Sequence, residues 1–242
     1  MHIIGLGTLA NTGAILLGGL VGLFCGKAVR PRMQETIVHG MAAATMFVGV
    51  SGTLKEMFRV GADGGVQSRG AFMMVMSIAA GAVLGELLDL DGMIERLGVW
   101  IRRVTHNERD NSFIDAFVTA SLTFCIGAMA IVGSIEDGLR GEPTTLYLKA
   151  VMDGVFTVAL VVSLGKGAIF SAIPIFLYQG GMTLGANLLA PVFTPVAMSN
   201  LSLVGNVLIF LVGWNIIHGR KTVRVANLLP ALVVAVVWAF VP

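Results

Sequence analysis

Residues 4–25 read IGLGTLANTGAILLGGLVGLFC, a run of apolar and small residues without a charged side chain. This run is long enough to cross a bilayer, because a spanning α-helix needs about 20 mostly apolar residues. Further runs of the same kind follow along the chain. They cover residues 33–54, 71–90, 112–134, 144–165, 168–190, 196–217 and 223–241. The sequence therefore predicts an all-α, polytopic transmembrane helical bundle of about eight spanning helices.

The composition agrees with this fold class. Of the 242 residues, 56% are hydrophobic and 12% are charged, and the mean hydropathy is +0.87. Soluble domains carry about 25% charged residues, so this chain has too few to cover the surface of a soluble monomer. Its 31 glycines lie mostly inside the apolar runs, which excludes a flexible linker and is typical of closely packed membrane helices. We expect one integral membrane domain over residues 1–242.

The basic residues predict the orientation of the chain. If the odd-numbered loops are cytoplasmic, most of the 16 Lys and Arg residues lie on that side. These are Lys27, Arg30, Arg32, Arg96, Arg102, Arg103, Arg109, Lys166, Arg220, Lys221 and Arg224. Cytoplasmic loops carry an excess of Lys and Arg, so this pattern places both termini outside. The division near Gly165-Lys166-Gly167 is the weakest, and a re-entrant hairpin there gives seven spans as the alternative.

Residues 91–104 predict an amphipathic helix at the inner membrane interface. Met93, Leu97, Trp100 and Val104 recur at helical spacing, and arginines flank them. Such a helix buries its apolar face among the lipid headgroups, and an ordinary structured loop is the alternative.

Two similar segments suggest an internal two-helix repeat, over residues 1–57 and 71–139. Gly18 and Gly22 precede the sequence TMFVG at 45–49, and Gly81 and Gly85 precede TFCIG at 123–127. Repeats are common in transporters, although short apolar matches also arise by chance.

The fifth run contains the deepest carboxylate of the sequence. Lys149, Asp153 and Thr157 are spaced four apart, so they share one helix face. Asp153 lies about 13 Å into the helix, where a charged side chain is costly. Two interpretations remain open: Lys149 neutralises Asp153 as a structural pair, or Asp153 couples transport to a proton or an ion.

Polar residues also line the fourth run. Asp115, Thr119 and Thr123 recur every four residues. They predict either a hydrophilic wall leading to the inner exit of a pathway, or helix packing in which the threonine hydroxyls bond to their own backbone.

The sixth run is predicted to break at Tyr178-Gln179-Gly180-Gly181, with Pro174 one turn earlier. Proline removes a backbone donor, paired glycines weaken a helix, and the freed carbonyl groups can coordinate a polar solute. A packing kink is the alternative. Asn206 in the seventh run falls near mid-membrane, as a solute ligand or as a hydrogen bond between helices, and Asn11 in the first run plays a similar role.

Catalytic and metal sites are not indicated. The sequence contains no Gly-x-Ser-x-Gly, His-Glu-x-x-His or phosphate-loop motif. Cys25 and Cys125 lie within or at the end of apolar runs, where they serve as small packing side chains. We expect neither enzymatic activity nor a cofactor or a bound metal.

The two ends of the chain resemble a known family. Residues 7–22, GTLANTGAILLGGLVG, and the segments SLVGN at 202–206 and RVANLLPA at 224–231 are similar to the YqgA/YdfK-type bacterial membrane proteins, domain of unknown function 554. Length and helix layout fit over essentially the whole chain. The resemblance implies a bacterial inner-membrane protein and a transporter or channel, and it supplies no functional residues.

Two hypotheses follow. The first is an inner-membrane transporter or channel-like carrier of a small polar or ionic solute, coupled to protons or cations. Its candidate site residues are Asn11, Asp115, Thr119, Thr123, Asp153, Thr157, Tyr178, Gln179, Gly180, Gly181 and Asn206. The second is a non-transporting scaffold, assembly factor or sensor that binds a partner through glycine-rich helix faces. In both, the expected partners are the lipid bilayer and further copies of the chain, and not nucleic acid.

Overall fold

The computed structural model describes residues 4–26, 28–60, 65–107, 110, 112–126, 128–218 and 222–241. The basic residues Lys27, Arg109, Arg220 and Lys221, and Gly127 of the predicted repeat, lie outside the described residues. The described residues are all-α apart from one short antiparallel hairpin, in which Phe58 lies opposite Ser68.

The elements follow the predicted runs closely. In chain order they are α1 (Leu6–Gly26), α2 (Pro31–Met57), β1 (Phe58–Val60), β2 (Val66–Ser68), α3 (Ala71–Leu88), α4 (Leu90–Val104), α5 (Phe113–Cys125), α6 (Ala128–Arg140), α7 (Thr144–Leu164), the 3₁₀ helix η1 (Lys166–Ser171), α8 (Ala172–Leu184), α9 (Ala186–Leu189), α10 (Pro195–Ile217), the 3₁₀ helix η2 (Val225–Leu228) and α11 (Pro230–Trp238). The start of α10 shows why the boundaries agree: Pro195 occupies the first turn, and the Thr194 hydroxyl accepts the Ala197 N–H at 3.2 Å.

Among the described residues, six helices are long and apolar enough to cross a membrane. They are Leu6–Gly26, Arg32–Met57, Ala71–Leu88, Thr144–Leu164, Lys166–Leu184 and Pro195–Ile217. The pair α5 and α6 makes a seventh if the two are counted as one span, although they are bent by 60°. The last predicted run forms only the shorter apolar helix Val225–Trp238. The count is therefore six or seven, rather than the expected eight.

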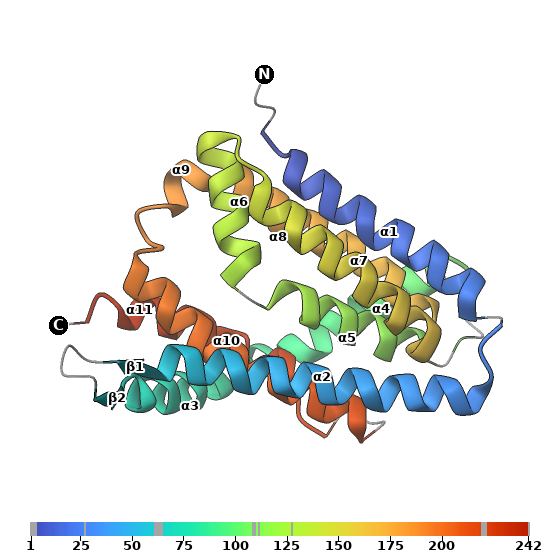
Figure 1. Cartoon of the computed structure of the whole chain (residues 1–242), viewed down its shortest axis with the longest axis horizontal. Helices are drawn as coiled ribbons and strands as arrows, with labels where there is room; N and C mark the ends of the chain where they lie inside the picture. The colour runs from blue at the N-terminus through green and yellow to red at the C-terminus, as the bar shows by residue number, and fades with distance from the viewer. Residues whose placement is uncertain are drawn as a thin grey trace. The chain divides into compact units, whose positions relative to one another are not determined.

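The chain divides into two compact units, and the first comprises Met1–Met41, Met93–Cys125 and Met129–Ala190. Within it, α1 runs side by side with α7 and also contacts η1 and α8 (Figure 1). The close approach requires glycine, because a Cβ on Gly18 would overlap the Gly154 carbonyl of α7 and a Cβ on Gly22 would lie 2.9 Å from the Val158 carbonyl oxygen. Ile15, Phe124 and Leu160 are buried in the core of this unit.

The second unit comprises Ala42–Gly92, Ile126–Ala128 and Pro191–Pro242. Here α3 contacts η2, α10 and α11. Gly81 and Gly85 of α3 provide the close approach, against Ala231 of α11 and Asn227 of η2, whereas Gly18 and Gly22 of α1 pack on α7.

Helix α4 covers the segment predicted to lie at the membrane interface. Met93, Leu97, Trp100 and Val104 are all exposed, with Trp100 at 59%, whereas Ile101 at the edge of this stripe is buried. The helix thus presents an apolar stripe outward, as an interfacial helix requires.

The sixth run does not break where the sequence predicted. Helix α8 continues through Tyr178, Gly180 and Gly181 to Leu184, so the expected break at Tyr178–Gly181 is wrong. Pro174 is the third residue of α8, where its missing N–H removes no intrahelical hydrogen bond. The irregular backbone lies earlier, at Gly165 with a φ of 107° and in η1.

Candidate functional site

Lys149 and Asp153 form a buried ion pair on α7. They lie one helical turn apart, each is 7% exposed, and the Lys149 ammonium donates to Asp153 Oδ2. Their sequence spacing places both on the face of α7 that packs against α1. As an ion pair the two groups are neutral together and leave no net charge inside the bundle.

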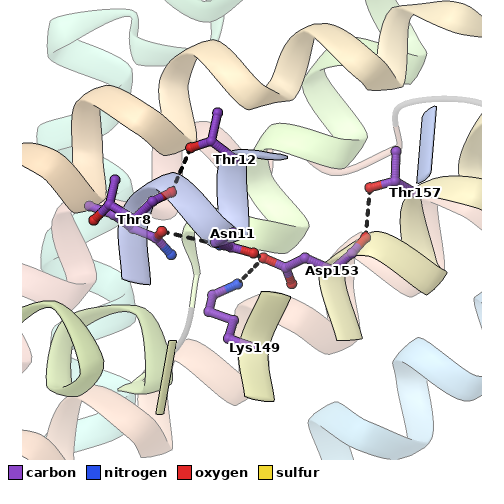
Figure 2. A network of polar contacts seen from close by, with 7 residues as sticks. Thr8, Asn11, Thr12, Lys149, Asp153 and Thr157 are labelled. Carbon is purple, nitrogen blue, oxygen red and sulfur yellow. Dashed lines mark hydrogen bonds and ion pairs between the residues drawn. The ribbon is translucent and has the colours of Figure 1, made fainter. Parts of the chain in front are cut away.

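Two amide side chains from other helices extend this pair (Figure 2). Asn11 of α1 donates through Nδ2 to Asp153 Oδ2 at 3.0 Å and to Gln179 Oε1 of α8 at 3.1 Å. Both amides are fully buried. We call Asn11, Lys149, Asp153 and Gln179 the central polar cluster. It joins three membrane-spanning helices of the first unit.

Two polar atoms of the central polar cluster have no hydrogen-bond partner among the described residues. They are Asn11 Oδ1, an acceptor, and Gln179 Nε2, a donor. Rotating the Gln179 amide by 180° would place its nitrogen, a donor, against the Asn11 donor. Rotating the Asn11 amide would place its oxygen against the Asp153 carboxylate. The network therefore fixes which amide atom is oxygen and which is nitrogen. Buried polar groups are normally paired, and an unpaired acceptor and donor side by side are what a bound water or polar solute would satisfy.

Threonines surround the cluster and bond mostly to nearby groups (Figure 2). The Thr12 hydroxyl donates to the Thr8 carbonyl at 2.9 Å, and the Thr157 hydroxyl donates to the Asp153 carbonyl at 2.6 Å. The hydroxyls of Thr8 and Thr183 lie 3.3 Å apart, linking α1 to α8. Thr157 therefore borders the cluster but uses its hydroxyl on its own helix.

Helix α5 contributes an aromatic and a thiol next to the ion pair. The Lys149 ammonium lies 5.8 Å from the centre of the Phe124 ring, within the range of a cation–π contact. Cys125 follows directly and lies within electrostatic range of both Lys149 and Asp153. No group of three His, Cys, Asp or Glu side chains suited to a metal occurs in the described part of the chain.

Several predicted site residues lie apart from this cluster. Asp115 is exposed in the first turn of α5, where a carboxylate is favoured by the helix dipole. The Thr123 hydroxyl donates to the Thr119 carbonyl at 2.7 Å. This is the backbone bond that the packing interpretation of Asp115, Thr119 and Thr123 expects. Asn206 belongs to the second unit and donates to the Ser202 carbonyl of its own helix at 2.7 Å. Tyr178 is half-buried on α8, and Gly180 and Gly181 are ordinary helical positions beside Gln179.

One buried carboxylate, Asp137, was not among the candidate site residues of the sequence. It follows the fourth apolar run and is fully buried on α6. Its Oδ2 accepts the backbone N–H groups of Gly5 and Gly7 at 3.2 and 3.1 Å, so it caps the N-terminus of α1 from another helix. The flanking Gly133 and Gly138, which both pack closely against neighbouring elements, are the sequence signal for burial there.

The second unit provides a comparison for the cluster. When Gly154 of α7 is paired with Gly205 of α10, seven of the nine buried positions of α7 coincide with buried positions of α10. When Pro174 of α8 is paired with Pro230 of α11, each follows a 3₁₀ helix that contains a buried polar residue, Ser171 or Asn227. In these pairings Asp153 corresponds to Val204, Lys149 to Asn200, Thr157 to Leu208 and Gln179 to Ala235. The second unit thus has no ion pair at the corresponding positions.

The comparison with known proteins agrees with the helix layout and with the family resemblance at the two ends of the chain. The family described as "Protein of unknown function (DUF554)" matches residues 6–240. The chain belongs to the DUF554 family. This DUF554 protein is 26% identical over 235 residues to the "Uncharacterized membrane protein YdfK" of Bacillus subtilis (strain 168), covering 97% of this chain and 96% of that one. It is also 26% identical over 234 residues to the "Uncharacterized protein YqgA" of Escherichia coli (strain K12), covering 95% and 94%.

No solved structure matches this DUF554 protein. The apolar helices and the relative described as a membrane protein together establish a multi-pass helical membrane protein. The resemblance noted from residues 7–22, 202–206 and 224–231 is confirmed by the family match. Neither relative's description assigns an activity.

Proposed function

We propose that this protein carries a small polar or ionic solute across the bacterial inner membrane, through a site formed by the central polar cluster. Asp153 is the coupling carboxylate, Lys149 its tethered counter-ion, and Asn11 and Gln179 are the solute ligands. The single observation that carries the proposal is a buried ion pair that shares a hydrogen-bond network with two amides, each with one unpaired polar atom.

Packing alone does not account for this cluster. Taking charged and amide groups out of water is expensive, and an apolar replacement of a buried ion pair is often neutral or stabilising. The second unit has buried Val204 and Ala235 at the positions that correspond to Asp153 and Gln179. Intramembrane ionisable residues of this kind typically mark substrate or ion pathways.

The packing of the glycines favours transport over the scaffold hypothesis. A scaffold would present the glycine faces of α1 and α3 to a partner, but these faces are covered by the chain's own helices. Gly18 and Gly22 lie against α7, and Gly81 and Gly85 lie against α11 and η2. The expected orientation, with both termini outside, remains part of the proposal.

The test uses purified full-length protein and a variant that carries the residues of the second unit, Lys149→Asn, Asp153→Val and Gln179→Ala. Thermal unfolding in detergent is measured with a panel of amino acids, monocarboxylates, sugars, nucleosides, halides, nitrate and alkali cations. Any compound that raises the Tm is then assayed for uptake into proteoliposomes loaded with the pH indicator pyranine. We expect at least one compound to stabilise and to be taken up by the natural protein, and the triple variant to fold but to show neither response. The proposal is overturned if no compound acts, or if the triple variant responds as strongly as the natural protein.

A further inference from the structure

The central polar cluster has both unused donors and unused acceptors. Within the described residues, the Lys149 ammonium bonds only to Asp153 and faces the Phe124 ring, so two of its three N–H groups are unpaired. The Gln179 amide nitrogen and the acceptor Asn11 Oδ1 have no partner there either, and the contacts of Asp153 use Oδ2, which leaves Oδ1 as a further acceptor. A proton on Oδ1 would use that acceptor, so a ligand that completes the protonated site must supply mainly acceptors.

The charge of the site limits which ligand can occupy it. The ion pair is neutral, so an anion bound beside Lys149 would leave one net negative charge in the bilayer interior. A proton added to Asp153 cancels that charge, and Oδ1 can take it because Lys149 and Asn11 both bond to Oδ2. A bound cation would instead leave two positive charges beside one carboxylate, unless Lys149 gave up its own proton. Buried charge without compensation is strongly unfavourable.

We infer that the solute is a small monovalent anion, such as a monocarboxylate or nitrate, which binds to Lys149 and Gln179 together with one proton on Asp153. This inference rests on the proposed transport function and names its substrate class. In the loaded state Asp153 is a neutral carboxylic acid, Lys149 keeps its proton and pairs with the anion, and Asn11 retains its contacts to both side chains. On release the anion and the proton leave together, and the Lys149–Asp153 pair forms again. One proton and one anion cross in each cycle, so no net charge moves.

The surroundings of Asp153 are consistent with one exchangeable proton. Lys149 is the charged group that acts on Asp153, and Asn11 is the other hydrogen-bond donor to it. Helix α1 carries no charged residue. Two further titratable groups lie near the pair: the Cys125 thiol of α5 and, next to it, the Tyr178 phenol of α8. Both are neutral in their protonated forms.

The other charged residues of the packed elements lie toward the helix ends. They are Asp115 on α5, Glu136, Asp137 and Arg140 on α6, and Lys166 on η1.

The deciding experiment compares four probes of similar size: lactate (an anion), lactamide (neutral), alanine (a zwitterion) and 1-amino-2-propanol (a cation). Nitrate serves as an inorganic anion. Proteoliposomes containing the full chain and pyranine are exposed to an inward gradient of each probe, with valinomycin and potassium setting the membrane potential. We expect lactate or nitrate to acidify the lumen several-fold faster than in empty liposomes, at a rate that a potential change of about 100 mV leaves unaltered.

Binding provides a second readout that needs no variant. Because one proton enters with each anion, the apparent affinity of the natural protein should weaken by about tenfold for each pH unit of increase above the range where Asp153 is protonated. Asp153→Asn mimics the protonated acid and should bind the anion with an affinity that no longer depends on pH. Lys149→Gln should abolish anion binding.

The outcomes separate this inference from the proposed function. If lactamide, alanine or 1-amino-2-propanol stabilises and enters through the cluster while both anions do not, the transport proposal holds and the anion inference is overturned. Anion entry that carries net charge or no proton also overturns it. If no compound of the thermal-unfolding panel and none of these probes stabilises the protein or is taken up, the proposed function fails and the inference fails with it.

Discussion

Breaking the Lys149–Asp153 pair on one side should be far more harmful than removing it entirely. Both side chains are about nine-tenths buried, so Lys149→Met or Asp153→Val leaves an uncompensated charge inside the bundle. Removing one partner of a buried pair costs about 3–5 kcal/mol. Asp153→Val also removes an acceptor from Asn11, which adds about 1 kcal/mol.

The double variant Lys149→Met/Asp153→Val should recover most of this loss. It leaves no unpaired charge, and apolar replacements of buried ion pairs are often neutral. We expect its free energy of unfolding to lie within about 1 kcal/mol of the natural protein, which corresponds to a coupling energy of about 5 kcal/mol or more between the two positions.

The measurement is reversible unfolding in mixed micelles by titration with sodium dodecyl sulfate, followed by circular dichroism. Thr157→Val is the matched control on the same helix face, because the Thr157 hydroxyl bonds only to its own backbone, and it should cost less than about 1 kcal/mol. The reasoning is refuted if each single variant costs less than about 1 kcal/mol, or if the double variant loses as much as the two single variants added together.

Three further predictions concern packing and the helix ends. Gly18→Leu should destabilise by about 3 kcal/mol or more, because the new side chain overlaps the α7 backbone, whereas Gly13→Leu faces open space and should have little effect on the detergent Tm. Asp137→Ala should cost about 2–3 kcal/mol by leaving two α1 N–H groups without their acceptor; Asp115→Ala, which removes an exposed carboxylate, serves as its control, and equal losses would contradict the capping role. Gly181→Ala should raise stability by about 0.5–1 kcal/mol, since α8 is regular there and a methyl group meets no neighbour; a clear loss in the same unfolding assay would indicate a functional break after all.

Hydropathy along the sequence determined the helices because a span is a local property. The run at 144–165 became α7 (Thr144–Leu164), and the run at 196–217 became α10 (Pro195–Ile217). The amphipathic stretch at 91–104 became α4. The ion pair of Lys149 with Asp153 was also one of the two interpretations of the sequence, because side chains four apart on a helix always meet.

Breaks in helices were predicted less well, since they depend on where a residue falls within an element. Pro174 and the glycines at 180 and 181 indicated a broken helix, yet Pro174 lies in a first turn that has no hydrogen bond to lose. The sharper irregularity, the 60° bend between α5 and α6, was not expected from the sequence. This bend makes the number of long apolar spans among the described residues six or seven, and the expected eighth span is missing because the last run forms only the shorter helix Val225–Trp238.

Only the tertiary structure decided which polar groups meet. Asn11 and Gln179 are 168 residues apart in the chain, and nothing in the spacing of either one indicates the other. Their contact depends on the rotation of α1 and α8 about their axes, which is fixed by close packing at Gly18 and by the Asp137 cap at the start of α1. The sequence by itself determined a membrane bundle and placed Lys149 and Asp153 on one helix face. The packing of distant helices turned that pair into a four-residue site, because the rotation of a helix is set by all of its neighbours and not by its own residues.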